Sequence, residues 1–331
     1  MKSYNDSLHE QLNIPLQRIN RDLERIVLHD PDVSSRSIVA QSVLELIRAG
    51  GKRLRPMMTI VGSRFGTEPE SDDAYRLAAV VEFIHAASLV HDDILDQADM
   101  RRGQPALHRK TGIYKAVHIG NYMMSRVIEL MTANVQEPER YIQDVTSVTT
   151  TQLCIGEYQQ MHHRYNFELS LDEYWEKTRN KTALLMATCL QVGAKASYAE
   201  DLVSDRLYAF GDNLGMAFQV RDDIMDFTKS AEQLGKPAGA DLRNGHATLP
   251  VILAMKDEAV ARKLLELHSA SPDAAFDEAI ELIRASGALE QALLMSHDFM
   301  RRAWNIIDQL SDFTAHKDLT TLWNYFEDRT Y

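Results

Sequence analysis

The chain has 331 residues, of which 45% are hydrophobic and 25% are charged, and it contains 15 glycines and 9 prolines. This composition is sufficient for a large core and excludes disordered, collagen-like and low-complexity proteins. The 36 lysines and arginines against 48 aspartates and glutamates give a net charge of -12. A nucleic-acid partner is disfavoured because phosphate backbones require basic surfaces. An anionic substrate would therefore need local cations or a metal ion.

The cysteines and the N-terminus bear on cellular location. Cys154 and Cys189 lie in apolar stretches without metal-binding spacing, so we interpret them as core thiols. Residues 1–13 are too polar for a secretory signal, and no window reaches about 18 consecutive apolar residues. We therefore expect a cytoplasmic protein.

The apolar pattern predicts helices along the whole chain. Apolar residues recur at three- and four-residue spacing, as over residues 38–47, and alternating strand patterns are missing. In chain order, breaks fall at residues 66–73, 103–105, 136–139, 229–250 and 268–273, which leaves helical segments of roughly 15 to 30 residues. No stretch has a linker composition. We expect an all-α fold, with residues 1–331 forming one large helical bundle around an apolar cavity.

One pattern, Asp-Asp-x-x-Asp, occurs twice, at residues 92–96 and 222–226. On a helix, the first and last aspartates of each copy share a face, so both carboxylates can reach one cation. A solvated acidic surface is the ordinary alternative. However, each copy ends a largely apolar run, where close carboxylates repel and lose solvation unless a cation neutralises them. Mg²⁺ fits best, because it binds through one or two carboxylates plus substrate phosphates.

Basic residues that could bind such a phosphate lie near both copies. Residues 50–56 read GGKRLRP, with three cations in four positions, and Arg101 and Arg102 follow the first copy. Lys181 and Lys236 lie on either side of the second copy. A solvated basic turn is the alternative for each. His85 lies two helical turns before Asp92 on the same face. The sequence is equally consistent with a buried core histidine and with a ligand at this position.

Five segments together resemble the trans-isoprenyl diphosphate synthases in order and approximate spacing. They are GGKRLRP at 50–56, EFIHAASLVHDDILDQADMRRGQP at 82–105, KTA at 181–183, GMAFQVRDDIMDF at 215–227 and LGKPAGADLRNGHATLP at 234–250. The resemblance covers nearly the whole chain. It is strongest to the catalytic subunit of bacterial heptaprenyl diphosphate synthases, including GEYQQ at 156–160. Asn121 and His246 depart from the family pattern, which often has aspartate and lysine there.

The resemblance implies the isoprenoid synthase fold and a head-to-tail prenyl transfer. Geranyl, farnesyl or geranylgeranyl diphosphate would ionise, and isopentenyl diphosphate would attack it. By this resemblance Asp92 and Asp96 bind two Mg²⁺ ions and Asp222 a third, with Asp93 and Asp226 in support. The implied catalytic residues are Asp92, Asp93, Asp96, Lys181, Asp222, Asp223 and Lys236, and the implied metal ligands are Asp92, Asp96, Asp222 and Asp226. Isopentenyl diphosphate would contact Lys52, Arg55, His85 and Arg102, and the allylic diphosphate would contact Arg101, Lys181, Thr182, Gln219 and Lys236.

Product length is predicted from the helix that precedes the first motif. Ala87 and Ser88 lie one turn before Asp92, and Ile84 lies about two turns before it, at roughly 5.4 Å per turn. An aromatic residue one turn below the motif stops the chain near 15 carbons in relatives, so small residues there predict a product of about 30 to 40 carbons. Close helix packing is the alternative reason for small residues.

Other functions remain open from the sequence. A class I terpene cyclase shares the aspartate motif and the helical fold, although its second metal motif normally differs. A noncatalytic subunit of a two-component synthase would be expected to lack intact aspartate motifs, and an active chain could still require a small partner. The resemblance implies a homodimer, or a heterodimer with a small noncatalytic subunit, a quinone side chain as destination and transient membrane contact for product release.

Overall fold

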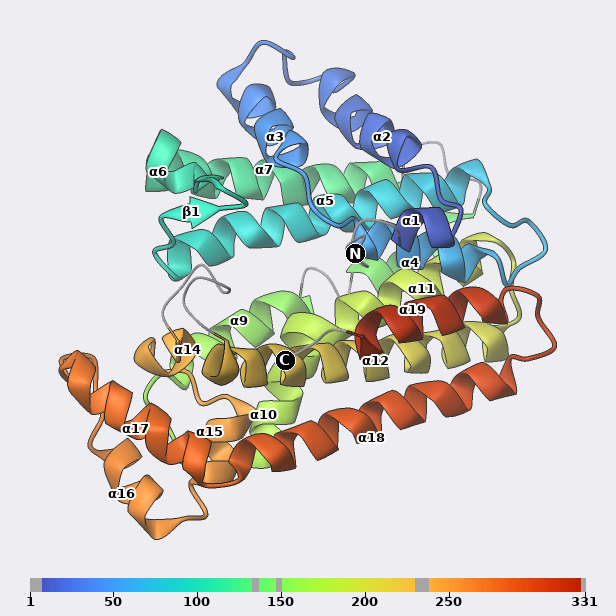
Figure 1. Ribbon diagram of the computed structural model, residues 1–331. Coiled ribbons are helices and arrows are strands. Elements are labelled where there is room, and N and C mark those ends of the chain that lie inside the picture. Colours follow the sequence, from blue (N-terminus) through green and yellow to red (C-terminus); the bar gives the residue numbers. More distant parts are fainter. Residues whose placement is uncertain (1–7, 133–136, 147–150, 230–237, 329–331) are drawn as a thin grey trace. The chain divides into compact units, whose positions relative to one another are not determined.

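The computed structural model describes residues 8–132, 137–146, 151–229 and 238–328 (Figure 1). The chain divides into two compact units. Unit 1 comprises residues 1–151, 185–208 and 310–321, and unit 2 comprises residues 152–184, 209–309 and 322–331. Nearly every described element is a helix, so the all-α prediction is confirmed. The prediction that residues 1–331 form one domain is not tested by this division and stays a prediction.

Unit 1 is built around α5, and it also contains a short hairpin. Its elements are α1 (Leu8–Gln11), α2 (Leu16–Leu28), α3 (Ile38–Arg48), α4 (Leu54–Ser63), α5 (Asp72–Leu95), β1 (Met100–Arg101), β2 (Gln104–Pro105), α6 (Leu107–Thr111), α7 (Ile113–Thr132), the 3-10 helix η1 (Pro138–Arg140), α8 (Ile142–Thr146) and most of α11 (Leu184–Ala196). β1 and β2 pair antiparallel. The sequence predicts only a break at residues 103–105, so these strands are an addition to it.

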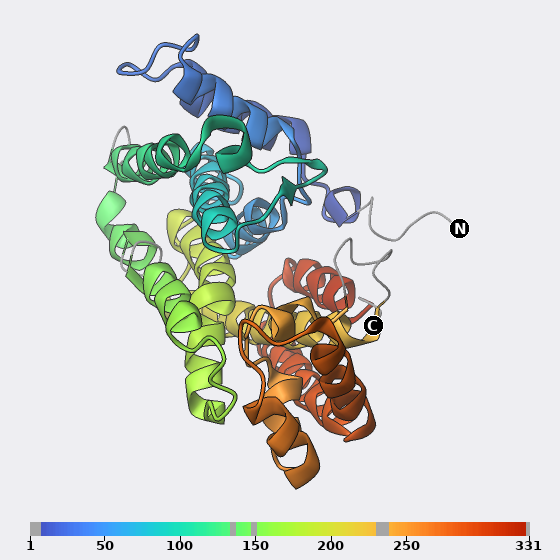
Figure 2. The same cartoon turned by 90° about the vertical axis from the view of Figure 1, so that its left-hand side faces the viewer.

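The helix α5 begins with a cap and ends with the first aspartate motif. The Ser71 hydroxyl accepts a hydrogen bond from the backbone N–H of Ala74, and Asp72 and Asp73 in the first turn suit the positive end of the helix dipole. Phe83 and Ile84 are fully buried. Helices α4 and α7 pack against α5, as Figures 1 and 2 show. This packing fixes α5 and thereby positions the aspartates at its end.

Unit 2 contains the second aspartate motif on its longest helix. Its elements are α9 (Leu153–His162), α10 (Leu171–Thr178), the π-helix η3 (Arg179–Ala183), most of α12 (Asp201–Thr228), α14 (Ala240–Arg243), α15 (Leu249–Ala254), α16 (Glu258–Leu265), α17 (Asp273–Ala285), α18 (Ala288–Gln309) and the second half of α19 (His316–Glu327). The predicted break at residues 229–250 thus includes α14 and the start of α15.

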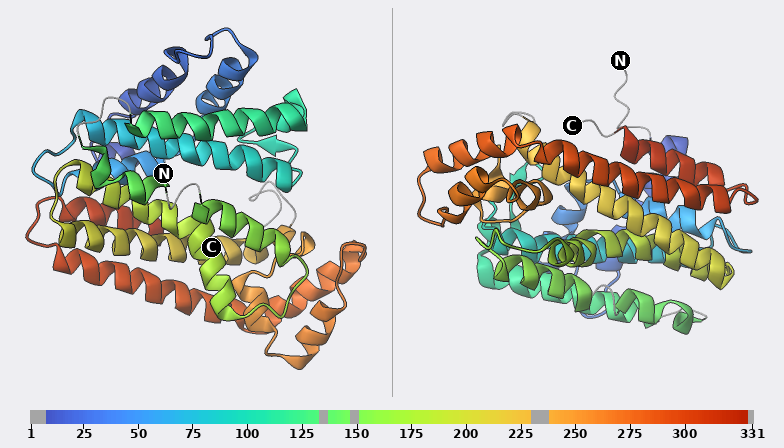
Figure 3. Two further views of the ribbon diagram at one scale, coloured as in Figure 1. Left: turned by 180° about the vertical axis from the view of Figure 1, so that it is seen from behind. Right: turned by 90° about the horizontal axis from the view of Figure 1, so that it is seen from below.

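A buried arginine anchors α12 immediately before this motif. Arg221 is 1% exposed, and its Nε donates to Ser296 Oγ on α18 at 3.1 Å. Its Nη2 pairs with Glu327 Oε2 at 2.5 Å. Helices α12 and α18 lie side by side in Figures 1 and 3. Because a buried charge is tolerated only with partners, this arrangement fixes the helix and the position of Asp222.

Every helix in the described ranges is either too short or too polar to cross a lipid bilayer.

Candidate active site

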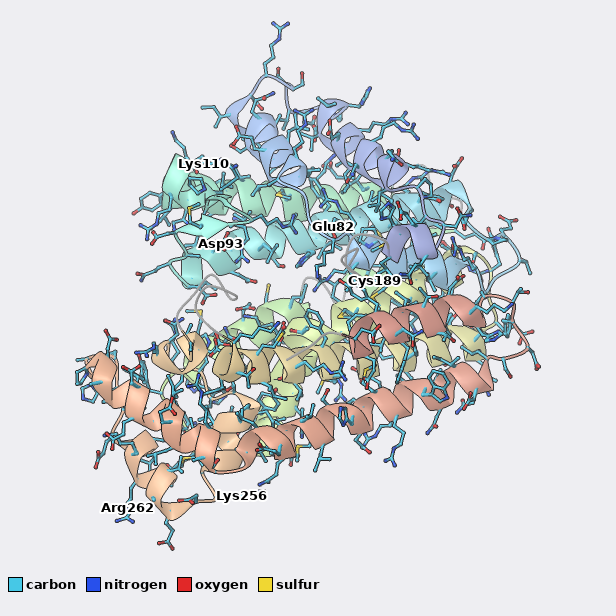
Figure 4. The ribbon with its side chains drawn as sticks, in the orientation of Figure 1. Glu82, Asp93, Lys110, Cys189, Lys256 and Arg262 are labelled. Carbon is cyan, nitrogen blue, oxygen red and sulfur yellow. The ribbon has the colours of Figure 1, made fainter. Side chains whose placement is uncertain are left out.

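The first aspartate motif forms the C-terminal end of α5. Asp92 and Asp93 lie in its last turn, and the N–H of the C-cap residue Asp96 donates to the carbonyl of Asp92 at 2.8 Å. Asp93, labelled in Figure 4, is buried, whereas Asp92 is partly exposed and Asp96 is exposed. Nε of Arg101 donates to Asp93 Oδ1 at 2.8 Å. The middle carboxylate is therefore neutralised within the protein, and the outer two are the more accessible.

The hairpin after α5 brings two arginines back toward this motif. Arg101 ends β1, and Arg102 follows in the turn with a left-handed backbone at φ 51°. Nη1 of Arg102 donates to the carbonyl oxygen of Gly50. A Cβ atom on Gly51 would lie 2.7 Å from Cζ of Arg102, and Gly51 has a φ of 138°. The glycine pair is therefore needed both for the turn and for the close approach of Arg102.

The two arginines of GGKRLRP have different surroundings. Arg53 is 5% exposed, and its guanidinium pairs with Glu82 Oε1 at 2.8 Å and donates to the Ile47 carbonyl at 2.6 Å. In contrast, Nε of Arg55 is buried and has no hydrogen-bond partner among the described residues. Burial also lowers the pKa of the Arg55 guanidinium. Arg53 thus holds the fold, while Arg55 retains a donor for an external anion.

His85 lies within the same cationic cluster. Burial holds the pKa of His85 well below its usual value, and the positive charges of Arg55 and Arg102 lower it further. Its imidazole is therefore neutral near pH 7. The structure brings Arg55, His85 and Arg102 together, with exposed Lys52 in the loop before α4. Such a concentration of cations in a chain of net charge -12 suits a polyanionic ligand.

The second aspartate motif differs in how its middle residue is held. Asp223 is 3% exposed and accepts hydrogen bonds from the Tyr174 hydroxyl at 2.7 Å, the Leu249 backbone N–H at 3.0 Å and Gln219 Nε2 at 3.0 Å. Burial raises the pKa of the Asp223 carboxyl. Asp226 is also buried, and its Oδ2 accepts from the N–H of Asp241 at 3.0 Å. Asp222 is partly exposed.

Two further predicted site residues belong to the Asp223 network. The Thr182 hydroxyl donates to Gln219 Oε1 at 2.8 Å, and the amide of Gln219 donates in turn to Asp223. A continuous chain of hydrogen bonds therefore links the KTA segment to the aspartate motif. Because each donor has one acceptor, the orientations of Thr182 and Gln219 are mutually fixed.

Lys181 lies in a π-helical turn between α10 and α11. A π-turn is uncommon and often occurs at functional sites. Nζ of Lys181 pairs with Glu157 Oε1 of α9 at 2.7 Å. A Cβ atom on Gly156 would lie 2.8 Å from the backbone nitrogen of Lys181, so this glycine permits the close packing of α9. The sequence predicts no role for Glu157, because nothing local in GEYQQ indicates its partner.

The chain-length candidates lie on α5. Ile84 and Ala87 are fully buried, and Ser88 is partly exposed, with its hydroxyl donating to the His85 carbonyl at 2.9 Å. Their role in product length stays a prediction. Lys236 lies outside the described residues.

Sequence reasoning also missed Lys177 and Tyr174. Tyr174 holds Asp223, and Lys177 is a buried lysine one turn before Lys181. The four-residue spacing between Lys177 and Lys181 is the feature of the sequence that could have identified Lys177. Nothing in the sequence identified Tyr174, because it lies 49 residues from Asp223.

The carboxylates fit a divalent metal that relies on its substrate for further ligands. Among the residues that the structure describes, no group of three or more His, Cys, Asp or Glu side chains is arranged to enclose a metal ion. Asp93, Asp223 and Asp226 are buried and bond to internal partners, whereas Asp92 and Asp222 are partly exposed and Asp96 is exposed. Mg²⁺ commonly binds through one or two carboxylates together with waters and substrate phosphates. The oxygen donors therefore fit Mg²⁺.

An all-helical chain with paired carboxylates and a cationic cluster has the features of an enzyme that acts on diphosphate esters. Comparison with known proteins specifies the family. A sequence model of the family described as polyprenyl synthetase matches residues 36–283. The chain therefore belongs to the polyprenyl synthetase family, and its enzyme class is that of the trans-polyprenyl diphosphate synthases.

Proteins of similar sequence match this chain over almost its full length. The chain is 35% identical over 320 residues to heptaprenyl diphosphate synthase component 2 of Bacillus subtilis, covering 97% of this chain and 89% of that protein. It is 36% identical to the component 2 protein of Geobacillus stearothermophilus, covering 98% and 99%. The predicted resemblance is thus confirmed.

Solved structures show the same fold. Heptaprenyl diphosphate synthase from Staphylococcus aureus matches with a TM-score of 0.90 and 33% identity, covering 97% of this chain and 99% of that chain. A polyprenyl synthase from Caulobacter crescentus, complexed with calcium and isoprenyl diphosphate, matches with a TM-score of 0.86 and 32% identity, covering 100% and 99%. The isoprenoid synthase fold is confirmed.

Proposed function

We propose that this chain condenses an allylic diphosphate with isopentenyl diphosphate, using Mg²⁺, to give an all-trans polyprenyl diphosphate and free diphosphate. The observation that carries this proposal is the cluster of Arg55, His85 and Arg102 beside α5, whose last turn presents Asp92. A cluster with more basic than acidic side chains favours binding of a diphosphate. The carboxylates favour binding of the metal ion that accompanies the diphosphate. The similar Caulobacter crescentus enzyme, which is complexed with calcium and isoprenyl diphosphate, supports this chemistry.

The isopentenyl diphosphate would be held by unit 1. Arg55 and Arg102 would form charge-assisted hydrogen bonds to its phosphates, with Lys52 at the edge. His85, being neutral, would donate one N–H to a phosphate oxygen and add no charge. Binding in this way would leave the alkene of the substrate oriented for attack and would require no nucleophilic side chain.

The allylic diphosphate would be held by Lys181 and Lys236, with Arg101 as a further cation. When bound, Mg²⁺ supplies electrostatic stabilisation of the departing diphosphate. Lys181 would exchange its partner Glu157 for a phosphate oxygen. The oxygen atoms of Thr182 and Gln219 would lie near the developing allylic cation, held there by their mutual hydrogen bond. Attack by isopentenyl diphosphate would leave a tertiary carbocation, and the departed diphosphate would take up the proton that this cation loses as the new double bond forms.

The product would have a medium or long chain. Similar proteins are named heptaprenyl, solanesyl and nonaprenyl diphosphate synthases, which supports a range of about C30 to C45. The prediction of about 30 to 40 carbons lies within it, at the shorter end. Small residues at 87 and 88 support a product longer than 15 carbons.

The chain would act as a homodimer or with a small noncatalytic subunit. The relatives from Bacillus and Geobacillus are named component 2, which supports a second component. Light scattering of the purified chain would give its mass, and a monomer would contradict a homodimer.

The direct test is an assay of the pure chain with Mg²⁺, farnesyl diphosphate and labelled isopentenyl diphosphate, followed by sizing of the product. We expect label in an all-trans polyprenyl diphosphate and none after chelation of the metal. Consumption of farnesyl diphosphate without isopentenyl diphosphate would instead indicate a terpene cyclase. Binding of both substrates without elongation would indicate a required partner.

A further inference from the structure

Lys177 is a buried cation without a direct hydrogen-bond or ion-pair partner among the described residues. It lies in the last turn of α10, two residues before the π-helix, and is 9% exposed. Its Nζ lies 5.0 Å from the centroid of the Tyr174 ring. Among the described residues, no carboxylate comes within ion-pair distance of this ammonium group and no hydrogen bond is made by it. Burying an ammonium group without such a partner is costly, so its position requires an explanation.

The neighbouring groups are satisfied by one another and not by Lys177. The hydroxyl of Tyr174, the N–H of Leu249 and the amide of Gln219 supply the three hydrogen bonds of Asp223. Glu157 pairs with Lys181 at 2.7 Å. Lys177 is therefore next to acidic groups electrostatically but outside their network of direct contacts.

The surroundings of Lys177 favour an external anion. Burial lowers the pKa of the Lys177 amine, the negative charge of Asp223 opposes this shift, and the positive charge of Lys181 adds to it. A phosphate group placed between the two lysines would contact both ammonium groups directly, whereas Glu157 pairs with Lys181 alone. Both lysines also lie on the same short segment, four residues apart, which orients them as a pair.

We propose that Lys177 binds the diphosphate of the allylic substrate together with Lys181, as an additional cationic ligand. The aromatic ring of Tyr174 holds the ammonium group until the substrate arrives. This inference rests on the proposed function, because it assigns a residue to the allylic site.

The test measures binding of farnesyl thiolodiphosphate, an unreactive analogue, by calorimetry in Mg²⁺. We expect Lys177→Met to weaken binding about 10- to 100-fold, the effect of losing a charged hydrogen bond, and Lys177→Arg to weaken it much less. Lys256→Met is the matched control. Lys256 is exposed, in the loop after α15 where Figure 4 labels it, so its removal should leave the affinity within about twofold of wild type.

A second measurement separates binding from a structural role. Pyrophosphate with Mg²⁺ should raise the melting temperature of the wild type, and most of that rise should be absent in Lys177→Met. A structural lysine would instead lower the melting temperature of the free protein and leave the ligand-induced rise intact. Wild-type affinity for the analogue in Lys177→Met would overturn the inference, whatever its stability.

The binding measurements distinguish a failure of the inference from a failure of the proposed function. If the proposed function is wrong, the wild-type chain does not bind the analogue. If only the inference is wrong, the wild type binds it, Lys181→Met loses binding and Lys177→Met does not. Should Lys177→Met not fold, a crystal structure of the wild-type complex decides. We expect Nζ of Lys177 within hydrogen-bond distance of a phosphate oxygen, and a separation above about 5 Å would contradict the proposal.

Discussion

The two aspartate motifs share a pattern but not an environment. In the first, the buried carboxylate of Asp93 pairs with Arg101, a cation for which the family resemblance implies contact with the allylic diphosphate. In the second, the buried carboxylate of Asp223 accepts only neutral donors, from Tyr174, Leu249 and Gln219, among the described residues. The five-residue pattern therefore places the outer carboxylates but does not specify how the middle one is stabilised.

This difference ties each motif to another part of its unit. Arg101 connects α5 to the hairpin that also carries Arg102, so Asp93 orders the cationic cluster. Tyr174 and Leu249 connect α12 to α10 and α15, so Asp223 orders the core of unit 2. We expect changes at Asp93 to act mainly on substrate binding and changes at Asp223 to act mainly on stability.

The largest effect is expected at the outer aspartates, where the motifs should behave alike. Asp92→Asn and Asp222→Asn should each lower kcat by about a thousandfold or more, because stabilisation of the departing diphosphate is lost. Melting temperatures should change little. Asp99→Asn is the control, since the Asp99 side chain is 80% exposed near the first motif. Wild-type turnover in either motif variant would show that this motif is not needed for the reaction.

Substitution of the middle aspartate should affect the stability of the protein differently in the two motifs. Asp223→Asn replaces a buried carboxylate, which accepts hydrogen bonds through both oxygens, with an amide whose NH2 group accepts none. The free energy of unfolding should therefore fall by about 1–3 kcal/mol. Asp93→Asn should cost less than about 1 kcal/mol, because the Arg101 side chain is 35% exposed and can be hydrated. Urea unfolding of both variants measures this difference. A larger loss for Asp93→Asn would show that the comparison is wrong.

Product length should depend on the helix of the first motif. Ala87→Phe places a ring one turn before Asp92 and should shift the product toward about 15 carbons. Chromatography of the dephosphorylated products gives the distribution. Ala86→Phe, on the neighbouring position of α5, is the matched control and should leave the length unchanged. An unaltered distribution in Ala87→Phe would contradict the role of this residue.

The smallest effect concerns pH and is specific to the first motif, whose helix carries His85. The folded-state pKa of His85 is lowered, so below about pH 6.5 the unfolded chain binds a proton that the folded chain does not. Stability should therefore fall as pH falls below about 6.5, by at most about 1.4 kcal/mol per pH unit from this residue. His85→Gln should flatten the decrease, and exposed His29→Gln should not. An equally steep decrease in His85→Gln would refute this assignment.

The parts of the site that could be predicted depend on local spacing. Asp92 and Asp96, or Asp222 and Asp226, share a face because a helix repeats every 3.6 residues, and no other part of the chain is needed to infer this. The fold class follows from the same periodicity over the whole chain.

The remaining parts depend on residues distant in sequence. Arg53 and Arg55 look equivalent in GGKRLRP, yet Glu82, 29 residues from Arg53, makes Arg53 structural. Likewise, Asp223 is held by a tyrosine 49 residues away. Such contacts arise only when helices pack, and neither composition nor periodicity carries that information.

The central proposal is that both aspartate motifs are required for the chain to bind an allylic diphosphate with Mg²⁺. A double-mutant cycle tests it most directly, using calorimetry of farnesyl thiolodiphosphate with Mg²⁺ in wild type, Asp92→Asn, Asp222→Asn and the double variant. We predict that each single variant loses most of the Mg²⁺-dependent affinity and that the double variant loses little more, because the loss of either motif already removes most of the metal-dependent binding. Losses that simply add, or wild-type affinity in either single variant, would contradict it.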